Sequence, residues 1–269
     1  MSDYQDIEFE IDDPVAIVRL NRPEKLNAVT YHTLSEIRRA MDSAAADPAV
    51  VGIVVTGNGR GFCSGLDSAA LMEVTSDGGE SRRTSSEGSS DVPGMFTYFL
   101  SIPKPIIAAV NGVAAGGGLM LAGMADVRIA SRNASFVTTF LKRGLIAEHG
   151  SSWILPRLVG PGHALDLLWR SPRIDAEEAL RLGLVEFVCE PEELLERARS
   201  YVKEIAASAA PQSLAETKKL VYDAMGLGYP EALREAEVAQ WKAVARPDAQ
   251  EGAKALLEKR QPQFRRLGS

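Results

Sequence analysis

Short apolar runs rich in branched residues alternate with helical patterns in the first half of the chain. Runs of this kind lie at residues 16–20, 50–56, 106–110 and 127–130. The first two are bounded by Pro, Asn or Gly, as buried strands are. Between these two runs, apolar side chains recur at helical spacing, at Leu34, Ile37, Met41 and Ala44. This order predicts an α/β core with parallel strands.

An uncharged stretch long enough to cross a bilayer occupies residues 105–125. The Asn111-Gly112 pair inside it is a turn signal, and the glycines from Gly116 to Gly118 would weaken a continuous helix. We therefore expect a strand, a glycine turn and a short helix that starts near Gly118, and no membrane segment.

Helical patterns dominate from residue 191 onward. Candidate helices, each opening on or beside a proline, lie at 191–208, 211–225, 230–244 and 247–259. We expect a core at 1–190 that carries the site and a helical region at 191–269 that serves as lid and oligomer interface. The segment at 76–94 is rich in Ser, Gly and charge and is expected to be a mobile loop, either a tolerated insertion or a lid.

Composition narrows the classes of function. The chain has 269 residues, 45% hydrophobic and 25% charged, with 36 acidic against 30 basic residues and a net charge of -6. This balance disfavours a nucleic-acid partner, which usually requires a basic surface. Cys63 and Cys189 are too few for a disulfide framework, and the acidic N-terminus lacks the features of a signal sequence, so we expect a cytoplasmic protein.

Two glycine-containing turns follow two of the predicted strands. The first runs from Gly59 to Asp67 and the second from Ala115 to Gly118. Glycine lets the backbone approach a ligand closely, and the start of a helix directs free N–H groups outward. Side by side, the turns could form an oxyanion hole, although each alone is equally consistent with an ordinary tight turn. Nucleotide, metal and Ser-His-Asp motifs do not stand out.

Several blocks of sequence resemble the crotonase superfamily of acyl-CoA enzymes, which includes enoyl-CoA hydratases and isomerases. The blocks are NRPEKLNA at 21–28, FCSGLD at 62–67, PIIAAVNGVAAGGG at 105–118, ADVRIA at 125–130, ALRLGLV at 179–185 and the ending at 251–264. The resemblance covers nearly the whole chain apart from 76–94. It implies an α/β fold, a crotonase-like spiral of ββα units with a C-terminal helical region, assembled as a homotrimer or as a hexamer made of two trimers.

The resemblance also implies the parts of an acyl-CoA site. The backbone N–H groups of Leu66 and Gly117 would form the oxyanion hole, and one such donor is worth roughly 3 kcal/mol. Coenzyme A would be part of the substrate, and no cofactor or metal would be required. The segments that would bind CoA or the acyl group contain Lys25, Leu26, Ala28, Ser64, Asp67, Met120 and Phe140.

Catalytic carboxylates are missing from two positions. The hydratases of the superfamily use two glutamates, and their places are taken here by Met120 and Phe140, which cannot move a proton. Some isomerases of the superfamily carry an acid at the position of Glu148 instead. We therefore expect Glu148 to be the single acid/base, although without the resemblance an acid placed before a helix at 151–158 would be favoured by the helix dipole alone. Met120, Phe140 and Trp153 are expected either to form an apolar surround for it or to be core residues.

Other titratable residues are expected to have structural roles. Adjacent side chains usually point to different faces, so we expect His149 to be packed or hydrogen-bonded elsewhere rather than paired with Glu148. His32 and His163 are expected to be ordinary helix residues, and Asp166 a solvated position on a helix.

These observations predict an enzyme that shifts the double bond of an enoyl-CoA through an enolate held in the oxyanion hole. Hydration of an enoyl-CoA, as in fatty-acid β-oxidation, is the alternative reaction, and it would require Glu148 to activate water alone or with Asp166. A non-catalytic acyl-CoA-binding protein is the alternative of a different class, because fold resemblance does not establish activity.

Overall fold

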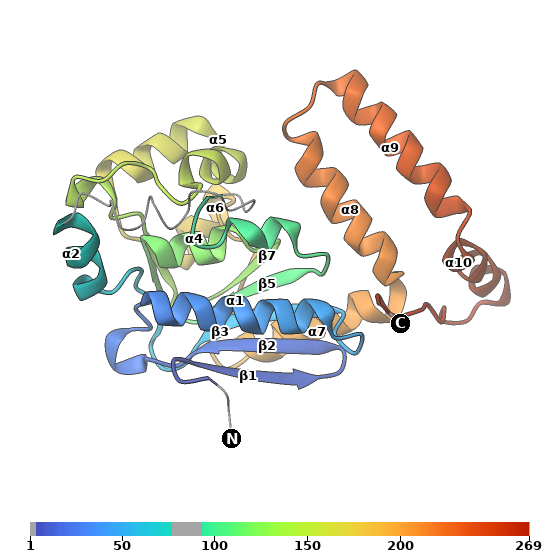
Figure 1. The fold of residues 1–269 in the computed structure, drawn as a ribbon, viewed down its shortest axis with the longest axis horizontal. Coiled ribbons are helices and arrows are strands. Elements are labelled where there is room, and N and C mark those ends of the chain that lie inside the picture. Colours follow the sequence, from blue (N-terminus) through green and yellow to red (C-terminus); the bar gives the residue numbers. More distant parts are fainter. Residues whose placement is uncertain (1–3, 77–92, 269) are drawn as a thin grey trace.

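A six-stranded sheet forms the centre of the computed structural model, which describes residues 4–76 and 93–268 (Figure 1). Its strands are β1 (Ile7–Asp12), β2 (Val15–Leu20), β3 (Gly52–Gly57), β5 (Ile106–Val110), β7 (Val127–Ser131) and β10 (Phe187–Cys189). They are paired in the order β1-β2-β3-β5-β7-β10. β1 runs antiparallel to β2, and the other pairs are parallel, as the sequence pattern predicts.

A smaller sheet of four short strands lies beside the first. Its strands, in order of pairing, are β4 (Gly61–Cys63), β6 (Val113–Ala115), β8 (Ser135–Val137) and β9 (Ile174–Asp175). The pairs β3/β4, β5/β6 and β7/β8 each place one strand in each sheet. The helices that follow these pairs are α2 (Ser68–Ser76), α4 (Gly117–Gly123) and α5 (Ser151–Arg170). This repeat is the predicted spiral of ββα units.

Helices cover both faces of the large sheet. Because side chains alternate along a strand, Val18 and Val55 belong to the core cluster shared with α1 (Tyr31–Ala46). Their neighbours Ile17 and Val54 pack instead with the cluster of α7 (Leu194–Ser208). Burial on both faces explains why these strands are continuous apolar runs, and each buried branched side chain contributes roughly 1.5–3 kcal/mol.

The uncharged stretch at 105–125 folds as expected from its glycines. It forms β5, β6 and α4, and every residue of β5 and α4 is buried. Its apolar character therefore reflects the protein core. Among the residues 4–76 and 93–268, no helix has the length and apolar composition required to cross a membrane.

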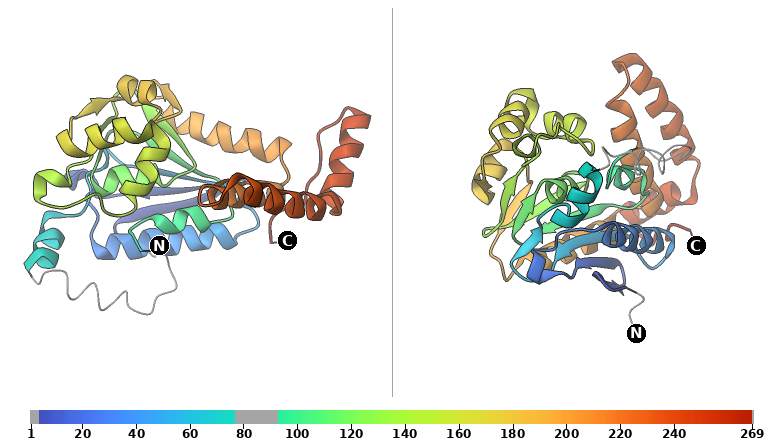
Figure 2. Two further views of the ribbon diagram at one scale, coloured as in Figure 1. Left: turned by 90° about the horizontal axis from the view of Figure 1, so that it is seen from above. Right: turned by 60° about the vertical axis from the view of Figure 1, so that its left-hand side comes forward.

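The C-terminal helices are confirmed, with small shifts at their ends. After α6 (Ala176–Leu182), α7 starts at Leu194 rather than near residue 191 and packs on the sheet. The helices α8 (Pro211–Ala224), α9 (Tyr229–Val244) and α10 (Pro247–Glu258) extend away from the core as an arm (Figure 2). The expected boundary after residue 190 stays a prediction.

The polar segment expected to form a loop lies mostly outside the described residues, which omit 77–92. Its first residue, Ser76, ends α2. Another detail differs from expectation in α5, which is one helical element broken at Gly160 (φ 77°, ψ 158°) between two prolines. Asp166, expected at a solvated position on a helix, belongs to it.

Candidate active site

The first glycine turn places the backbone of Leu66 beside the loop at 26–29. Gly65 adopts a φ of +92°, which only glycine takes readily, and its carbonyl accepts a 2.9 Å hydrogen bond from Val29 N. Asp67 N donates in turn to Val29 O at 2.9 Å. Leu66 N–H lies between these two bonds and donates to no protein acceptor within the described residues.

The second glycine turn opens α4. Gly116 takes a left-handed φ of 52° as the N-cap residue, and its N–H donates to Val137 O. Gly117 is the first residue of α4, so its N–H has no partner within the helix. Gly118 packs against the first turn so tightly that a Cβ atom on it would lie 1.9 Å from Cys63 O. The two turns can approach this closely only with glycine at 118.

The Leu66 and Gly117 amides lie side by side. A Cβ atom on Gly117 would be 3.8 Å from Leu66 N, and a Cβ atom on Gly65 would be 3.2 Å from Gly117 N. Two unpaired N–H groups in a rigid backbone can hold an oxygen atom that gains negative charge, without reorganising as the charge develops. The structure thus brings together the two amides that the sequence singles out.

Asn27 fastens the loop at 22–28 to the first turn, a role that sequence reasoning missed. Its buried side chain donates to Asn58 O at 2.9 Å and to Gly61 O at 2.7 Å, and it accepts from Arg22 N. The positive φ of 55° at Asn27 could not be read from the sequence, although Asn is a residue type that tolerates it.

Arg22 is a second residue of this loop that sequence reasoning missed. Its guanidinium donates to Ala28 O at 2.6 Å and lies 3.4 Å from an Asp67 carboxylate oxygen. The Asp67 carboxylate therefore already has an ion-pair partner in Arg22. Ser64 Oγ donates to the Lys25 carbonyl, and the Lys25 side chain itself is exposed at the edge of the loop.

Glu148 lies on a turn between η3 (Leu141–Arg143) and α5. Its carbonyl accepts from Ser151 N at 3.0 Å, which joins the turn to the first residue of the helix. The next two residues, His149 (φ 54°) and Gly150 (φ 82°), both adopt left-handed conformations. His149 Nε2 lies 3.4 Å from Glu148 Oε1. The expectation of no pair between them is wrong, because alternation of faces applies to helices and strands and not to a left-handed turn.

The segment at 94–97 lies between the turn that carries Glu148 and the start of α4 at Gly117. A Cβ atom on Gly94 would lie 3.6 Å from the His149 carbonyl carbon, and one on Gly150 would lie 3.3 Å from Thr97 Cγ2. The intervening residue, Met95, brings its sulfur to 3.3 Å from the position of a Gly117 Cβ. The consecutive residues Gly94 and Met95 thus lie against the turn of Glu148 and against Gly117 respectively.

The apolar side chains expected to surround Glu148 leave its carboxylate partly exposed to solvent in the single chain. Met120 and Phe140 are buried in the main core cluster, whereas Trp153 is partly exposed and carries the Arg157 guanidinium 4.1 Å from its ring centre. The Glu148 side chain itself remains 33% exposed. Met120 and Phe140 keep carboxylates out of their two positions, but the three apolar side chains do not enclose Glu148.

A cavity of about 1040 Å³ lies next to the glutamate turn. Gly150, Trp153 and Met124 line it on one side and η2 (Thr97–Ser101) on another, and α8 closes it. The Tyr98 hydroxyl in its wall is buried and finds no hydrogen-bond partner among the described residues, and burial raises the pKa of this phenol. A space of this size, mostly apolar and beside Gly150, suits a bulky apolar group.

The remaining candidates have ordinary roles. Asp166 pairs with Arg170 on the exposed side of α5, and His32 lies 3.2 Å from Glu36 on α1. Burial raises the pKa of Cys63 to about 12, so this thiol stays protonated and is a poor nucleophile. In the described ranges, no group of three His, Cys, Asp or Glu side chains could hold a metal ion.

Comparisons with known proteins agree with this architecture. A family model described as Enoyl-CoA hydratase/isomerase matches residues 10–266. Crotonyl-CoA hydratase of Syntrophomonas wolfei is 36% identical over 262 residues, which cover 97% of this chain and 98% of that protein. (E)-Benzylidenesuccinyl-CoA hydratase of Thauera aromatica is 35% identical over 260 residues, covering 96% of this chain and 98% of its own length.

Solved structures show the same similarity in three dimensions. The crystal structure of an enoyl-CoA hydratase from Bacillus anthracis aligns with a TM-score of 0.86 at 30% identity, covering 98% of this chain and 100% of its own. Sequence and structure agree over almost the entire length. The chain therefore belongs to the enoyl-CoA hydratase/isomerase family of the crotonase superfamily and is an acyl-CoA enzyme of that class.

Proposed function

We propose that this enzyme moves the double bond of a 3-enoyl-CoA thioester to the 2-position, with Glu148 as its single acid/base. The observation that carries the proposal is the pair of adjacent amides at Leu66 and Gly117, neither of which donates to an acceptor in the described part of the chain, with Glu148 as the carboxylate on the neighbouring turn. The positions that hold glutamates in the hydratases of the superfamily are occupied by Met120 and Phe140, both buried and unable to transfer protons.

The proposed reaction requires one proton to leave and return. Glu148 takes a proton from C2, and the C–H electron pair forms a C1–C2 double bond while the carbonyl pair moves to the thioester oxygen. The Leu66 and Gly117 N–H groups donate to that oxygen and stabilise its charge. The carbonyl then re-forms, the double bond shifts to C2–C3, and C4 takes the proton from the Glu148 carboxylic acid.

Hydration of a 2-enoyl-CoA is the second candidate reaction. It is favoured by the names of the relatives, among them the crotonyl-CoA hydratase and the (E)-benzylidenesuccinyl-CoA hydratase. Hydration requires a group that activates water and a group that protonates C2, and Glu148 would have to serve both steps or share them.

A paired assay separates the two reactions. Wild type, Glu148→Gln and Asp166→Asn are given a 3-enoyl-CoA and a 2-enoyl-CoA, and migration and hydration are followed by product analysis. We expect Glu148→Gln to lose about 1000-fold in migration, because the amide cannot accept the C2 proton. Asp166→Asn should match wild type. Hydration as the main wild-type reaction, or migration that survives Glu148→Gln, would overturn the proposal.

The same proposal assigns the binding of coenzyme A. The loop with Lys25, Leu26 and Ala28 would hold the CoA moiety together with Ser64 and Asp67, and the Lys25 ammonium would meet a phosphate. Met120 and Phe140 would stand behind the acyl group. Coenzyme A enters as part of the substrate, and the proton transfers above need no other cofactor, no metal and no nucleic-acid or membrane partner.

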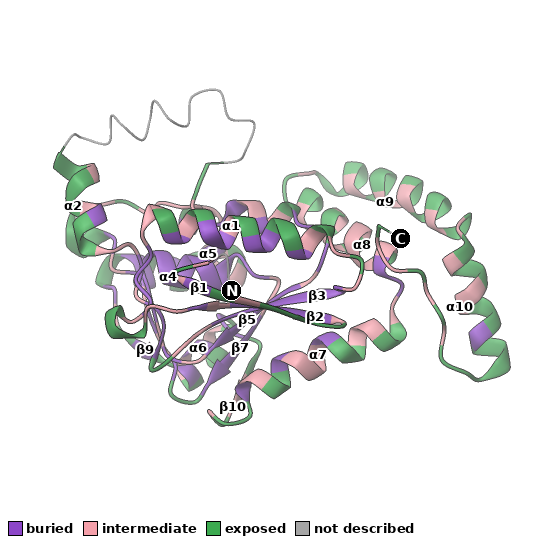
Figure 3. Ribbon diagram, turned by 60° about the horizontal axis from the view of Figure 1, so that its bottom comes forward, coloured by how far each residue is buried: buried purple, intermediate pink, exposed green. Residues whose placement is uncertain are grey.

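We also place the enzyme in the cytoplasm as a homotrimer, or as a hexamer of two trimers, formed by its C-terminal helices. None of the residues of α9 is buried in the single chain (Figure 3). Large apolar side chains are exposed along the arm, at Val221, Met225, Tyr229, Leu233, Val238, Trp241, Val244, Leu256 and Leu257. Such an arm is stabilised when another copy covers it.

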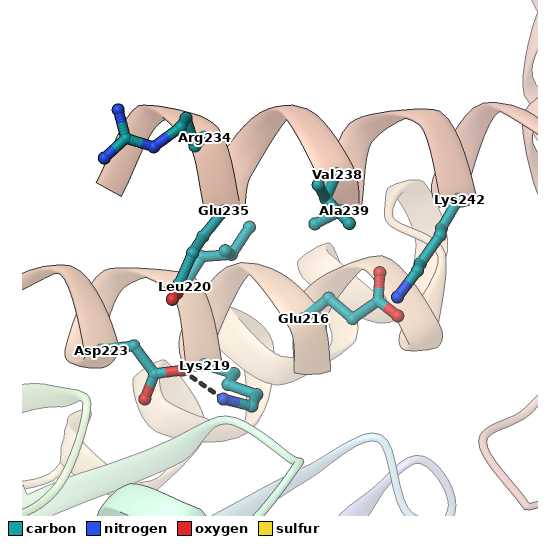
Figure 4. A pocket seen from close by; sticks show the side chains of 9 residues that line it. All are labelled: Glu216, Lys219, Leu220, Asp223, Arg234, Glu235, Val238, Ala239 and Lys242. Carbon is teal, nitrogen blue, oxygen red and sulfur yellow. Dashed lines mark hydrogen bonds and ion pairs between the residues drawn. The ribbon is translucent and has the colours of Figure 1, made fainter. Parts of the chain in front are cut away.

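The groove between α8 and α9 has no part in the proposed chemistry. It encloses about 410 Å³, and Leu220, Val238 and Ala239 give it an apolar floor between charged edges (Figure 4). On the edge formed by α8, two of the charged side chains, Lys219 and Asp223, form an ion pair with each other. The groove is thus part of the arm and contains no residue assigned to acyl-CoA.

A further inference from the structure

The imidazole of His149 and the carboxylate of Glu148 form a pair that the proposed reaction does not yet use. The distance from Nε2 to Oε1 is 3.4 Å. Among residues 4–76 and 93–268, His149 alone forms an ion-pair contact with the Glu148 carboxylate, and this carboxylate accepts no hydrogen bond from them. The orientation of the proposed base therefore depends on a single neighbour.

The backbone that carries His149 is well anchored. Its carbonyl carbon packs against Gly94, and the adjoining Gly150 adopts a φ of 82°, which only glycine takes readily. Ile154 N and Trp153 N donate to Gly150 O at 2.9 and 3.0 Å. The backbone of His149 is thus anchored to the start of α5, and its imidazole is less exposed (23%) than the longer side chain of Glu148 (33%).

We propose that His149 is a positioning residue that holds the carboxylate of Glu148 in the orientation required for proton transfer. The inference rests on the proposed role of Glu148. One carboxylate must reach first C2 and then C4 of the same acyl group, so a carboxylate free to rotate would spend most of its time misdirected. An imidazole that lies 3.4 Å from Oε1 of the carboxylate leaves Oε2 to take the proton.

The left-handed backbone at His149 limits which substitutions remove the imidazole without straining the chain. An alanine at φ 54° would add backbone strain to the loss of the imidazole, whereas glycine adopts this conformation freely. His149→Gly therefore removes the side chain alone. His149→Gln keeps an N–H donor at about the reach of Nε2, and His163→Gln changes an exposed histidine of α5 as the matched control.

Steady-state migration of a 3-enoyl-CoA is measured for these variants, for Glu148→Gln and for the double variant Glu148→Gln/His149→Gly. We expect His149→Gly to lower kcat by about 30-fold with KM within about twofold of wild type, since positioning acts on the chemical step. His149→Gln should retain at least about a third of the wild-type kcat, and free imidazole should partly restore His149→Gly. The double variant should be no slower than Glu148→Gln, because the histidine acts through the glutamate.

The outcomes separate the two proposals. Full activity of Glu148→Gln would overturn the proposed function. Loss of activity in Glu148→Gln together with a kcat of His149→Gly within about twofold of wild type would overturn only the role of His149. If His149→Gly does not fold, His149→Asn replaces it, because asparagine tolerates the left-handed backbone and its amide is too short to take the place of Nε2. A kcat of His149→Asn within about twofold of wild type contradicts positioning, whereas a lowered kcat in His149→Asn with a retained kcat in His149→Gln supports it.

Discussion

Lys218 on α8 and Asp126, just before β7, form an ion pair with an Nζ–Oδ2 distance of 2.7 Å. Lys218 also donates to the carbonyls of Phe99 and Lys104, and Tyr222 donates to the other Asp126 oxygen at 2.9 Å. Burial lowers the pKa of Lys218, and the charge of Asp126 opposes this shift. The network joins the otherwise protruding arm to the core, beside the cavity that adjoins the glutamate turn.

Removing the charge of Lys218 should loosen this attachment. We expect Lys218→Met to lower the free energy of unfolding by about 2 kcal/mol, because it leaves a largely buried Asp126 carboxylate without its cation. The neighbouring Lys219→Met removes an exposed pair with Asp223 and should cost less than about 0.5 kcal/mol. Urea denaturation of both variants measures the difference, and equal costs would contradict this role for Lys218.

The contact between the two glycine turns should not tolerate a side chain. In Gly118→Ala the new methyl would meet Cys63 O at 1.9 Å, so the turns must separate, and we expect a loss of more than about 3 kcal/mol. Gly162→Ala is the matched control, since no atom lies within 4 Å of its Cβ position. Thermal denaturation compares the two. A Gly118→Ala protein as stable and active as the control would show that the two turns need not meet closely.

The exposed ammonium of Lys25 should contribute to the binding of CoA and not to the chemistry. We expect Lys25→Ala to raise KM about threefold to tenfold at low salt with kcat unchanged, and the effect should shrink as salt screens the phosphates. Lys203→Ala, an exposed lysine of α7, should leave KM unchanged. A KM for Lys25→Ala that equals wild type at low ionic strength would remove Lys25 from the CoA site.

The apolar arm should mediate self-association. Trp241 on α9 is 61% exposed in the single chain, and we expect Trp241→Glu to disrupt the assembly because a charge would be buried in the interface. Light scattering coupled to size-exclusion chromatography should give the molar mass of three or six chains for wild type and for the control Lys203→Glu. Trp241→Glu should give a smaller molar mass. A monomeric wild-type protein would exclude the proposed trimer.

The local pattern of apolar residues was sufficient to predict the buried strands and the amphipathic helix of the core. The strand Ile106–Val110 is predicted with its observed bounds, and Leu34, Ile37 and Met41 indicate α1 by their spacing alone. Short strands of the second sheet were missed, because three residues such as Gly61–Cys63 carry no periodicity. The edge strand Ile7–Asp12 was missed as well, since it is mostly exposed and acidic.

The sequence by itself determined the alternation of strands and helices in the core and the two glycine turns. Its motifs indicated the family, and the resemblance to that family implied the ββα repeat and the amides at Leu66 and Gly117. These features depend on residue types at fixed spacing, which the chain displays directly. Only the tertiary structure decided that His149 reaches Glu148, that Asn27 fastens the loop of Lys25 to the first turn, and that Lys218 joins the arm to Asp126. Such contacts depend on local backbone dihedral angles and on packing between residues far apart along the chain, and no single segment encodes them.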